Sequence, residues 1–237
     1  MKQPMLVTLL GVATLLIHGK ESLAMPTAVQ SEPAPSSAPN PDKLAGDAGL
    51  LGTADGQRLL KYAVQCALPA GDSLSAMHDG APLVLEGSMG LAPEWKQQAL
   101  PATAQRWLTA CILSRINAFG VPVQIDMRGD HPALRRLTPE ETHDYTFQEG
   151  AFYGNFFADP PTMYVCRGHG GERAAPTKKL RVCTEPLSAP ETSRCGMELT
   201  GECADICQED PTDHSFRMCA GGSTRYSEVV TVFLKVP

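Results

Sequence analysis

The sequence lacks the short motifs that most directly identify common enzyme classes. It contains no His-Glu-x-x-His metalloprotease motif, no Gly-x-Ser-x-Gly hydrolase motif, no phosphate-binding loop and no dinucleotide-binding fingerprint. It also lacks an EF-hand loop, an Asn-x-Ser/Thr glycosylation site and the Cys-x-x-Cys pair of thiol oxidoreductases. The sequence therefore indicates none of these chemistries, and no cofactor is expected.

Excess positive charge and long apolar runs are also missing. The formal net charge is −6, which argues against broad nucleic-acid binding because that activity needs a basic surface. The one long apolar run, from Met5 to Ile17, is shorter than the roughly 20 residues that a membrane-spanning helix needs. We therefore expect no nucleic-acid partner and no stable membrane insertion of the mature chain.

The apolar run belongs to the three-part pattern of a secretory signal. Lys2 gives a positive start, and the small residues Ser22 and Ala24 mark a cleavage site after the run. We expect residues 1–24 to be a signal peptide and the protein to be secreted or periplasmic. The Pro-, Ala- and Ser-rich stretch 25–45 has the composition of a flexible linker. Residues 46–237 then form a single disulfide-stabilised domain, with a cysteine-rich part at about 160–237.

Helical and strand patterns alternate along this domain. Apolar residues recur at helical spacing over 55–68 and 103–117, and a third helix starts at Thr138-Pro139. Asp79-Gly80 favours a hairpin turn between 74–76 and 83–85. Further strands are expected at 121–127, 163–166 and 228–236. The predicted fold class is α+β: two or three packed helices, a small and mostly antiparallel sheet, and a disulfide-rich C-terminal part.

Eight cysteines, an even number, predict a disulfide framework in an exported protein. They are Cys66, Cys111, Cys166, Cys183, Cys195, Cys203, Cys207 and Cys219. The first two lie on the apolar faces of the two main predicted helices, so we expect a bridge between them. A bridge between Cys166 and Cys183 would staple the Gly- and Lys/Arg-rich loop that they flank. The last four stay unassigned, although Cys203 and Cys207 would share one face of a helix and bond different partners.

Zinc is the alternative for the last four cysteines, with His214 nearby. Structural zinc sites usually have closely spaced cysteine pairs at both ends of a loop, and only one short gap is present here. An oxidising compartment also favours disulfides. We therefore expect no metal, while a zinc-stapled module remains an alternative in which Cys203 and Cys207 share one tetrahedral site.

Half of the tyrosine, phenylalanine and tryptophan residues lie between 145 and 164. They form either a binding platform or the core of the domain, and we favour the core because aromatic side chains dominate core burial. If they are buried, Glu149 and Asn155 both need polar partners. The candidate binding residues are Tyr153 in this segment and Arg167 and His169 in the loop that follows it.

Two further patterns have weak links to function. His131, Glu141, His143, Asp144 and His169 could supply a carboxylate–imidazole site, but acidic residues in a first helical turn also favour the positive end of the helix dipole. Arg128-Gly129-Asp130 spells an adhesion tripeptide, and Gly-Asp also suits a turn after a strand.

The leading hypothesis is an exported, non-catalytic binding domain, whose partner would be a protein, a glycan or a small molecule. The alternatives are a secreted hydrolase that uses the His/carboxylate group, with or without a metal, and the zinc-stapled module. Geometry separates them, because a hydrolase needs at least two of the imidazoles and a carboxylate in one pocket.

Overall fold

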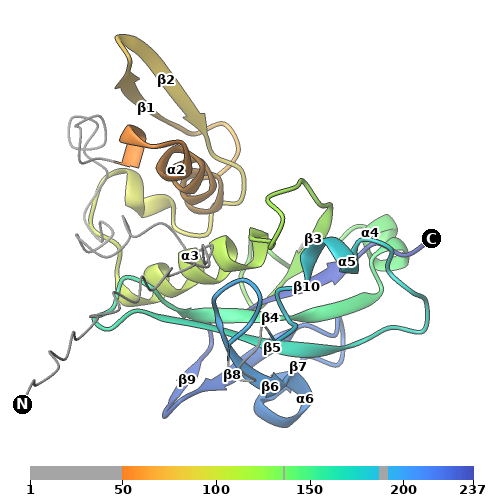
Figure 1. Ribbon diagram of the computed structural model, residues 1–237. Coiled ribbons are helices and arrows are strands. Elements are labelled where there is room, and N and C mark those ends of the chain that lie inside the picture. The colour runs from red at the N-terminus through yellow and green to blue at the C-terminus, as the bar shows by residue number, and fades with distance from the viewer. Residues whose placement is uncertain (1–49, 136, 187–191) are drawn as a thin grey trace, which may run out of the picture.

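The computed structural model describes residues 50–135, 137–186 and 192–237. The predicted signal peptide 1–24 and linker 25–45 lie outside the described residues. Figure 1 shows helix α2 and the β1–β2 hairpin on one side, then helix α3, a five-stranded sheet and a three-stranded sheet. Helices and sheets joined by four disulfides confirm the predicted α+β class. None of the described helices combines the length and apolarity needed to cross a membrane.

The first layer follows the sequence pattern closely. The short η2 turn (Leu50–Gly52) precedes α2 (Ala54–Ala67), whose N-cap Thr53 accepts a hydrogen bond from the Gly56 N–H at 3.0 Å. Strands β1 (Ser73–His78) and β2 (Ala81–Glu86) pair as the predicted hairpin. Asp79 and Gly80 in its turn have φ values of 49° and 77°, the left-handed geometry that Asp-Gly favours.

Helix α3 (Ala102–Arg115) follows the η3 turn (Pro93–Lys96) and lies between α2 and the main sheet. Its Cys111 forms the predicted disulfide with Cys66 of α2, with 6.0 Å between the two Cα atoms. Polar Thr109 and Ser114 are buried along with the apolar residues of α3, because the helix is covered on two sides. Thr109 satisfies its hydroxyl by donating to the Gln105 carbonyl at 2.8 Å.

The main sheet has the strand order β3-β10-β4-β5-β6. Its members are β3 (Ile125–Arg128), β10 (Val230–Leu234), β4 (Phe147–Asn155), β5 (Thr162–Gly170) and β6 (Glu198–Glu202). Every pair is antiparallel except β5–β6. The centre of β4 is covered on both faces, and a Cβ on its Gly150 would lie 2.2 Å from the Cys166 carbonyl oxygen. Glycine is therefore required where these two strands meet.

The second sheet packs below the first and contains β7 (Cys207–Glu209), β8 (Phe216–Gly221) and β9 (Thr224–Tyr226). Three short helices complete the described part of the fold: α4 (Pro139–Asp144), α5 (Lys178–Arg181) and α6 (Cys203–Ile206). Disulfide Cys166–Cys203 joins β5 to α6, and Cys207–Cys219 joins β7 to β8. The small sheet is thus covalently attached to the large one through α6.

Two sequence-based predictions were wrong in detail. Cys166 and Cys183 do not pair, because each finds a closer partner in the tertiary structure, Cys203 and Cys195 respectively. The strand expected at 121–127 begins only at Ile125, because the backbone at Val121 bonds instead to the side chain of Asn117.

A buried ion pair connects the main sheet to the segment after β5. Arg181 of α5 donates from Nε to Glu149 Oε2 of β4 at 2.7 Å, and both side chains are almost fully buried. Arg181 also donates from Nη2 to the Ser114 carbonyl at 2.8 Å. Burial raises the pKa of Glu149, and the positive charge of Arg181 opposes this effect. Buried Glu149 was expected to need a polar partner, and the structure shows that this partner is Arg181.

Candidate functional site

The candidate His/carboxylate residues do not gather in one pocket. Glu141 Oε2 accepts a hydrogen bond from the Thr138 N–H at 2.8 Å, as the capping box of α4 requires. His143 Nδ1 lies 2.9 Å from Asp144 Oδ1, and Lys235 also reaches Asp144 at 2.9 Å. The hydrogen bonds from His143 and Lys235 lower the pKa of Asp144. These residues cap and stabilise an exposed helix terminus.

The other two imidazoles lie elsewhere. The His131 ring packs edge-on against Trp107, with 5.1 Å between the ring centroids, and its Nδ1 accepts from the Ala133 N–H. Burial lowers the pKa of His131. His169 is exposed on β5. Among the described residues, no three His, Asp or Glu side chains bring their ligand atoms together.

Of the three candidate binding residues, Tyr153 is not accessible. Its side chain is fully buried beside Tyr164 and Tyr226, and its hydroxyl bonds to Thr200 Oγ1 and the Ala220 carbonyl, each at 2.8 Å. Burial raises the pKa of Tyr153 to about 12, so the phenol stays neutral. The prediction that Tyr153 contacts a ligand is wrong, because this ring fills the space between the two sheets.

Arg167 and His169 are accessible to different degrees. Arg167 Nη1 donates to Glu202 Oε1 at 2.7 Å across the β5–β6 edge, and both side chains are about half exposed. Within the described part of the chain no side chain bonds to the His169 ring, while the His169 backbone N–H donates to Gln148 Oε1 at 3.2 Å. The structure places both residues on β5, and neither lines the cavity described below.

The adhesion tripeptide has no free arginine. Arg128 is buried, donates from Nε to Asp126 Oδ2 at 2.6 Å, and lies over the Phe233 ring with 3.8 Å between the guanidinium carbon and the ring centroid. Its other donors bond to the Asp213 and Tyr145 carbonyls. Arg128 therefore holds three segments together and cannot reach a receptor.

The zinc alternative fails its own geometric requirement. Cys203 begins α6, whereas Cys207 is the extended C-cap of this helix and the first residue of β7. As expected, each of the two bonds a different cysteine. All eight cysteines are in disulfides, which fits an oxidising compartment.

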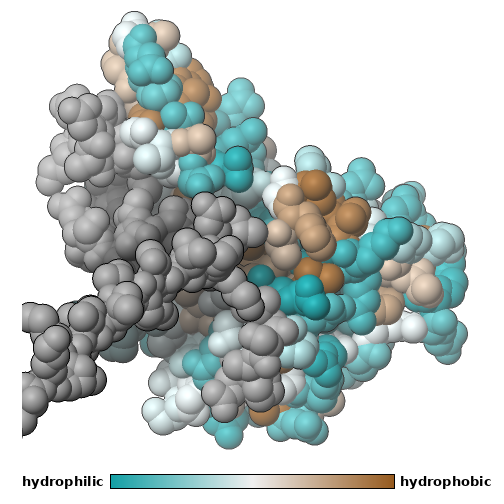
Figure 2. All heavy atoms as spheres, in the orientation of Figure 1, coloured by the Kyte–Doolittle hydropathy of each residue, from teal (hydrophilic) through white to brown (hydrophobic). Residues whose placement is uncertain are grey.

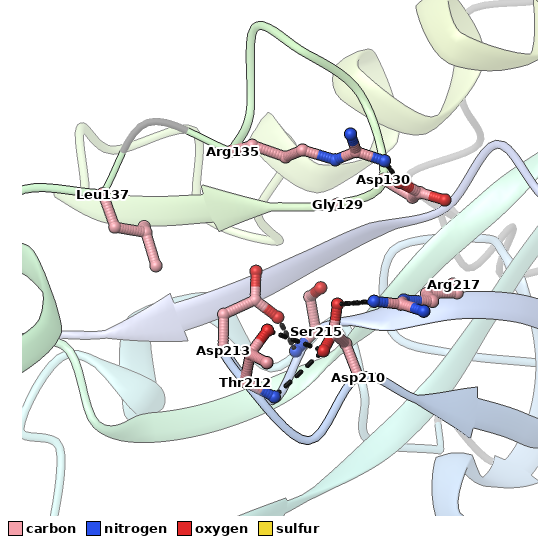
Figure 3. A pocket seen from close by; sticks show the side chains of 9 residues that line it. All are labelled: Gly129, Asp130, Arg135, Leu137, Asp210, Thr212, Asp213, Ser215 and Arg217. Carbon is pink, nitrogen blue, oxygen red and sulfur yellow. Dashed lines mark hydrogen bonds and ion pairs between the residues drawn. The ribbon is translucent and has the colours of Figure 1, made fainter.

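A cavity of about 300 Å³ lies between the segment after β3 and the β7–β8 connection. Figure 3 shows Asp130 and Arg135 on one wall and Asp210 and Arg217 on the other. Each wall carries its own ion pair: Arg135 contacts Asp130, and Arg217 Nε donates to Asp210 Oδ2 at 2.9 Å. Hydrogen bonds from Thr212 and Arg217 lower the pKa of Asp210 to about 2. The charges of the cavity are thus largely neutralised in pairs within each wall.

An exposed apolar loop is the second surface feature. The chain between α3 and β3 presents Ala118, Phe119, Gly120, Val121 and Pro122, all exposed, and we call these five residues the apolar loop. Phe119 is 57% exposed and Val121 is 37% exposed. Figure 2 shows brown, hydrophobic spheres where this connection lies in Figure 1. Contiguous exposed apolar residues are a common feature of contact surfaces, so the apolar loop is a candidate binding surface.

The conformation of the apolar loop is fixed by Asn117. Its Oδ1 accepts from the N–H groups of Phe119 and Val121 at 3.0 and 3.2 Å, and its Nδ2 donates to the Val121 carbonyl at 2.6 Å. The Gly120 N–H donates to the Asn117 carbonyl at 3.4 Å. Four backbone polar groups of the loop are therefore satisfied without a partner.

Sequence reasoning missed this surface because it assigned Val121 to a strand. The available signal was the unbroken apolar run from Ala118 to Val123 next to Asn117, a residue that commonly bonds the backbone of turns. No protein-family model matches the sequence, and comparisons with curated proteins and with solved structures gave no match.

Proposed function

We propose that the protein is exported and acts as a non-catalytic binding protein that docks on a partner protein through the apolar loop. The secretory pattern of residues 1–24 and the four disulfides support export. The dispersal of the candidate catalytic groups favours binding over hydrolysis. The observation that carries the function is an apolar loop that is exposed although its backbone is fixed.

The fixed backbone lowers the cost of binding in two ways. A preformed loop loses little conformational entropy when it docks. Its backbone groups are bonded to Asn117, so removing water from the loop leaves few polar groups unsatisfied. Phe119 is then the natural anchor, because buried aromatic residues provide much of the energy of protein interfaces.

A protein with an apolar pocket suits this loop better than a lipid surface does. Biological membranes are commonly anionic, and the chain has a formal net charge of −6. Peripheral membrane proteins usually combine apolar residues with a basic surface. The short loop instead has the size of a single anchor for a pocket in a partner.

The test has two stages and uses the full chain. A photoreactive phenylalanine derivative is placed at position 119 in producing cells, and at position 84 as a matched control, because Val84 is 54% exposed on the hairpin. We expect a discrete adduct with one protein at 119 only. The partner is then purified, and Phe119→Ser should weaken its Kd about 30-fold, the loss of about 2 kcal/mol typical of an anchor. Val84→Ser should leave Kd unchanged.

The same variants separate the alternatives. Equal crosslinking at positions 119 and 84, or an unchanged Kd for Phe119→Ser, would refute docking through the apolar loop. Co-sedimentation with anionic vesicles that depends on Phe119 would point to a lipid surface and would also overturn the proposed protein partner.

A further inference from the structure

Two disulfides lie in direct contact in the core between the two sheets. Sγ of Cys166 is 3.6 Å from Sγ of Cys207, although the two belong to different bonds. The sulfurs of Cys166, Cys207 and Cys219 all lie within 4.8 Å of one another. Cys203 is bonded to Cys166 at 2.03 Å. We call these four residues the sulfur cluster.

The chain connects the two disulfides through one helical turn. Cys203 starts α6, and the backbone N–H of Cys207 donates to the Cys203 carbonyl at the end of this helix. This single turn brings both sulfurs to Cys166 on β5, because Cys203 is bonded to Cys166 and the Cys207 sulfur lies 3.6 Å from it.

Access from solvent is unequal. Cys166, Cys203 and Cys219 are fully buried, while Cys207 is partly exposed. A reductant from solution therefore reaches the Cys207–Cys219 bond through Cys207. Attack on a disulfide depends on such access, and it proceeds from a thiolate onto one of the two sulfurs.

We propose that the sulfur cluster is an internal thiol–disulfide exchange site. A small-molecule thiol or phosphine first reduces Cys207–Cys219 and leaves two thiols. The Cys207 thiolate then attacks Sγ of Cys166, the Cys166–Cys203 bond breaks, and its electron pair leaves on Cys203, which takes up a proton. The product contains a Cys166–Cys207 bond and thiols at Cys203 and Cys219. The second step changes no oxidation state overall.

The distance supports this second step. Reacting atoms held about 3–3.5 Å apart are positioned for attack, and the sulfurs are 3.6 Å apart before any rearrangement. Exchange keeps β5 attached to the end of α6, while the preceding reduction has already removed the covalent link between β7 and β8. The β7–β8 connection forms one wall of the cavity that Asp130, Arg135, Asp210 and Arg217 line. Reduction would therefore loosen that wall while the small sheet stays attached to the main sheet.

The first experiment uses Cys219→Ser in the full chain, which leaves a free thiol at Cys207. The control is Cys195→Ser, which opens the other disulfide that joins cysteines 12 positions apart and frees Cys183. Thiols are blocked at acidic pH, and cleavage before Asp205 separates the peptides of Cys203 and Cys207. We expect the Cys166–Cys207 disulfide peptide in an amount of at least about a tenth of the native Cys166–Cys203 peptide. This ratio corresponds to a free-energy difference of at most about 1.4 kcal/mol between the two disulfide forms. The control should keep Cys166–Cys203 intact.

A second measurement covers the case in which Cys219→Ser does not fold. The wild-type protein is partly reduced with a water-soluble phosphine, trapped and mapped in the same way. Among molecules that have lost the Cys207–Cys219 bond, we expect blocked thiols at Cys203 and Cys219. Blocked thiols at Cys207 and Cys219, with Cys166–Cys203 intact throughout, would overturn the exchange site.

Discussion

The buried ion pair between Arg181 and Glu149 gives the sharpest stability prediction. Arg181→Met removes the guanidinium that donates to Glu149 at 2.7 Å, and it also removes a hydrogen bond to the Ser114 carbonyl. Breaking a buried pair on one side typically costs about 3–5 kcal/mol, because the remaining charge is left without compensation. We expect a loss of this size at pH 7.

The loss of stability caused by Arg181→Met should depend on pH, because Glu149 can avoid a buried charge by binding a proton. Neutralising a carboxyl group with an ordinary pKa of 4.5 costs about 1.4 kcal/mol per pH unit above that value, or about 3.4 kcal/mol at pH 7. At pH 5 the same protonation costs only about 0.7 kcal/mol. Without Arg181 nothing from that side chain opposes the burial that raises the pKa of Glu149. A carboxyl whose folded-state pKa is raised contributes stability that is fully present below 4.5 and is lost as the pH rises. The free energy of unfolding of Arg181→Met should therefore increase by about 2.7 kcal/mol when the pH falls from 7 to 5.

Urea unfolding at pH 7 and pH 5, with the disulfides intact, measures both effects. The matched control is the double variant Glu149→Leu/Arg181→Met, which removes both charges and should recover most of the stability at pH 7. A loss below about 1 kcal/mol at pH 7, or an equal loss at both pH values, would refute the account of an uncompensated buried charge.

Three further predictions concern packing, and urea unfolding tests each of them. Cys66→Ala/Cys111→Ala opens a link across 45 residues and should cost about 4 kcal/mol on the chain-entropy estimate; an unchanged midpoint would contradict it. Gly150→Ala should cost about 1–3 kcal/mol, because its Cβ would lie 2.2 Å from the Cys166 carbonyl oxygen; a neutral effect would show that β4 and β5 separate easily. Tyr153→Phe should cost about 1–3 kcal/mol, because it removes two hydrogen bonds worth about 0.5–1.5 kcal/mol each, and no loss would mean that water replaces the hydroxyl.

The local elements were largely predictable. Helix α2 has its cap at Thr53, the hairpin has Asp79-Gly80 at its turn, and α3 has apolar residues at helical spacing. Each of these signals acts over a few neighbouring residues, so the sequence displays it directly. The Cys66–Cys111 bridge was also predictable, because two helices that pack through their apolar faces bring residues on those faces together.

The strand arrangement was less predictable. The aromatic segment was expected to be core, and β4 is indeed buried, but its glycines and mixed side chains show no alternation typical of a strand. The reason is that α3 covers one face of β4 and the small sheet covers the other, so polar and apolar positions need not alternate. The sequence predicted that a buried Glu149 would need a polar partner, but it did not identify Arg181 as that partner.

The candidate sites depended still more on tertiary contacts. Arg128 and Tyr153 are residue types suited to binding, yet both are buried, because Asp126 and the facing tyrosines provide their partners. Phe119 is a residue type suited to a core, yet it is exposed. Residue type alone does not reveal which polar group will find a partner or which apolar group will remain without one.

The sequence by itself determined the helices, the hairpin, the abundance of disulfides and the secretory pattern, because these follow from local propensity, composition and short-range spacing. Tertiary structure decided which cysteines pair, which strands adjoin and which side chains remain exposed. Six cysteines allow 15 pairings, and only the positions of β5, α6 and β8 bring Cys166 to Cys203 and Cys207 to Cys219. Pairing depends on distances in space between residues 37 and 12 positions apart, and sequence spacing does not encode those distances.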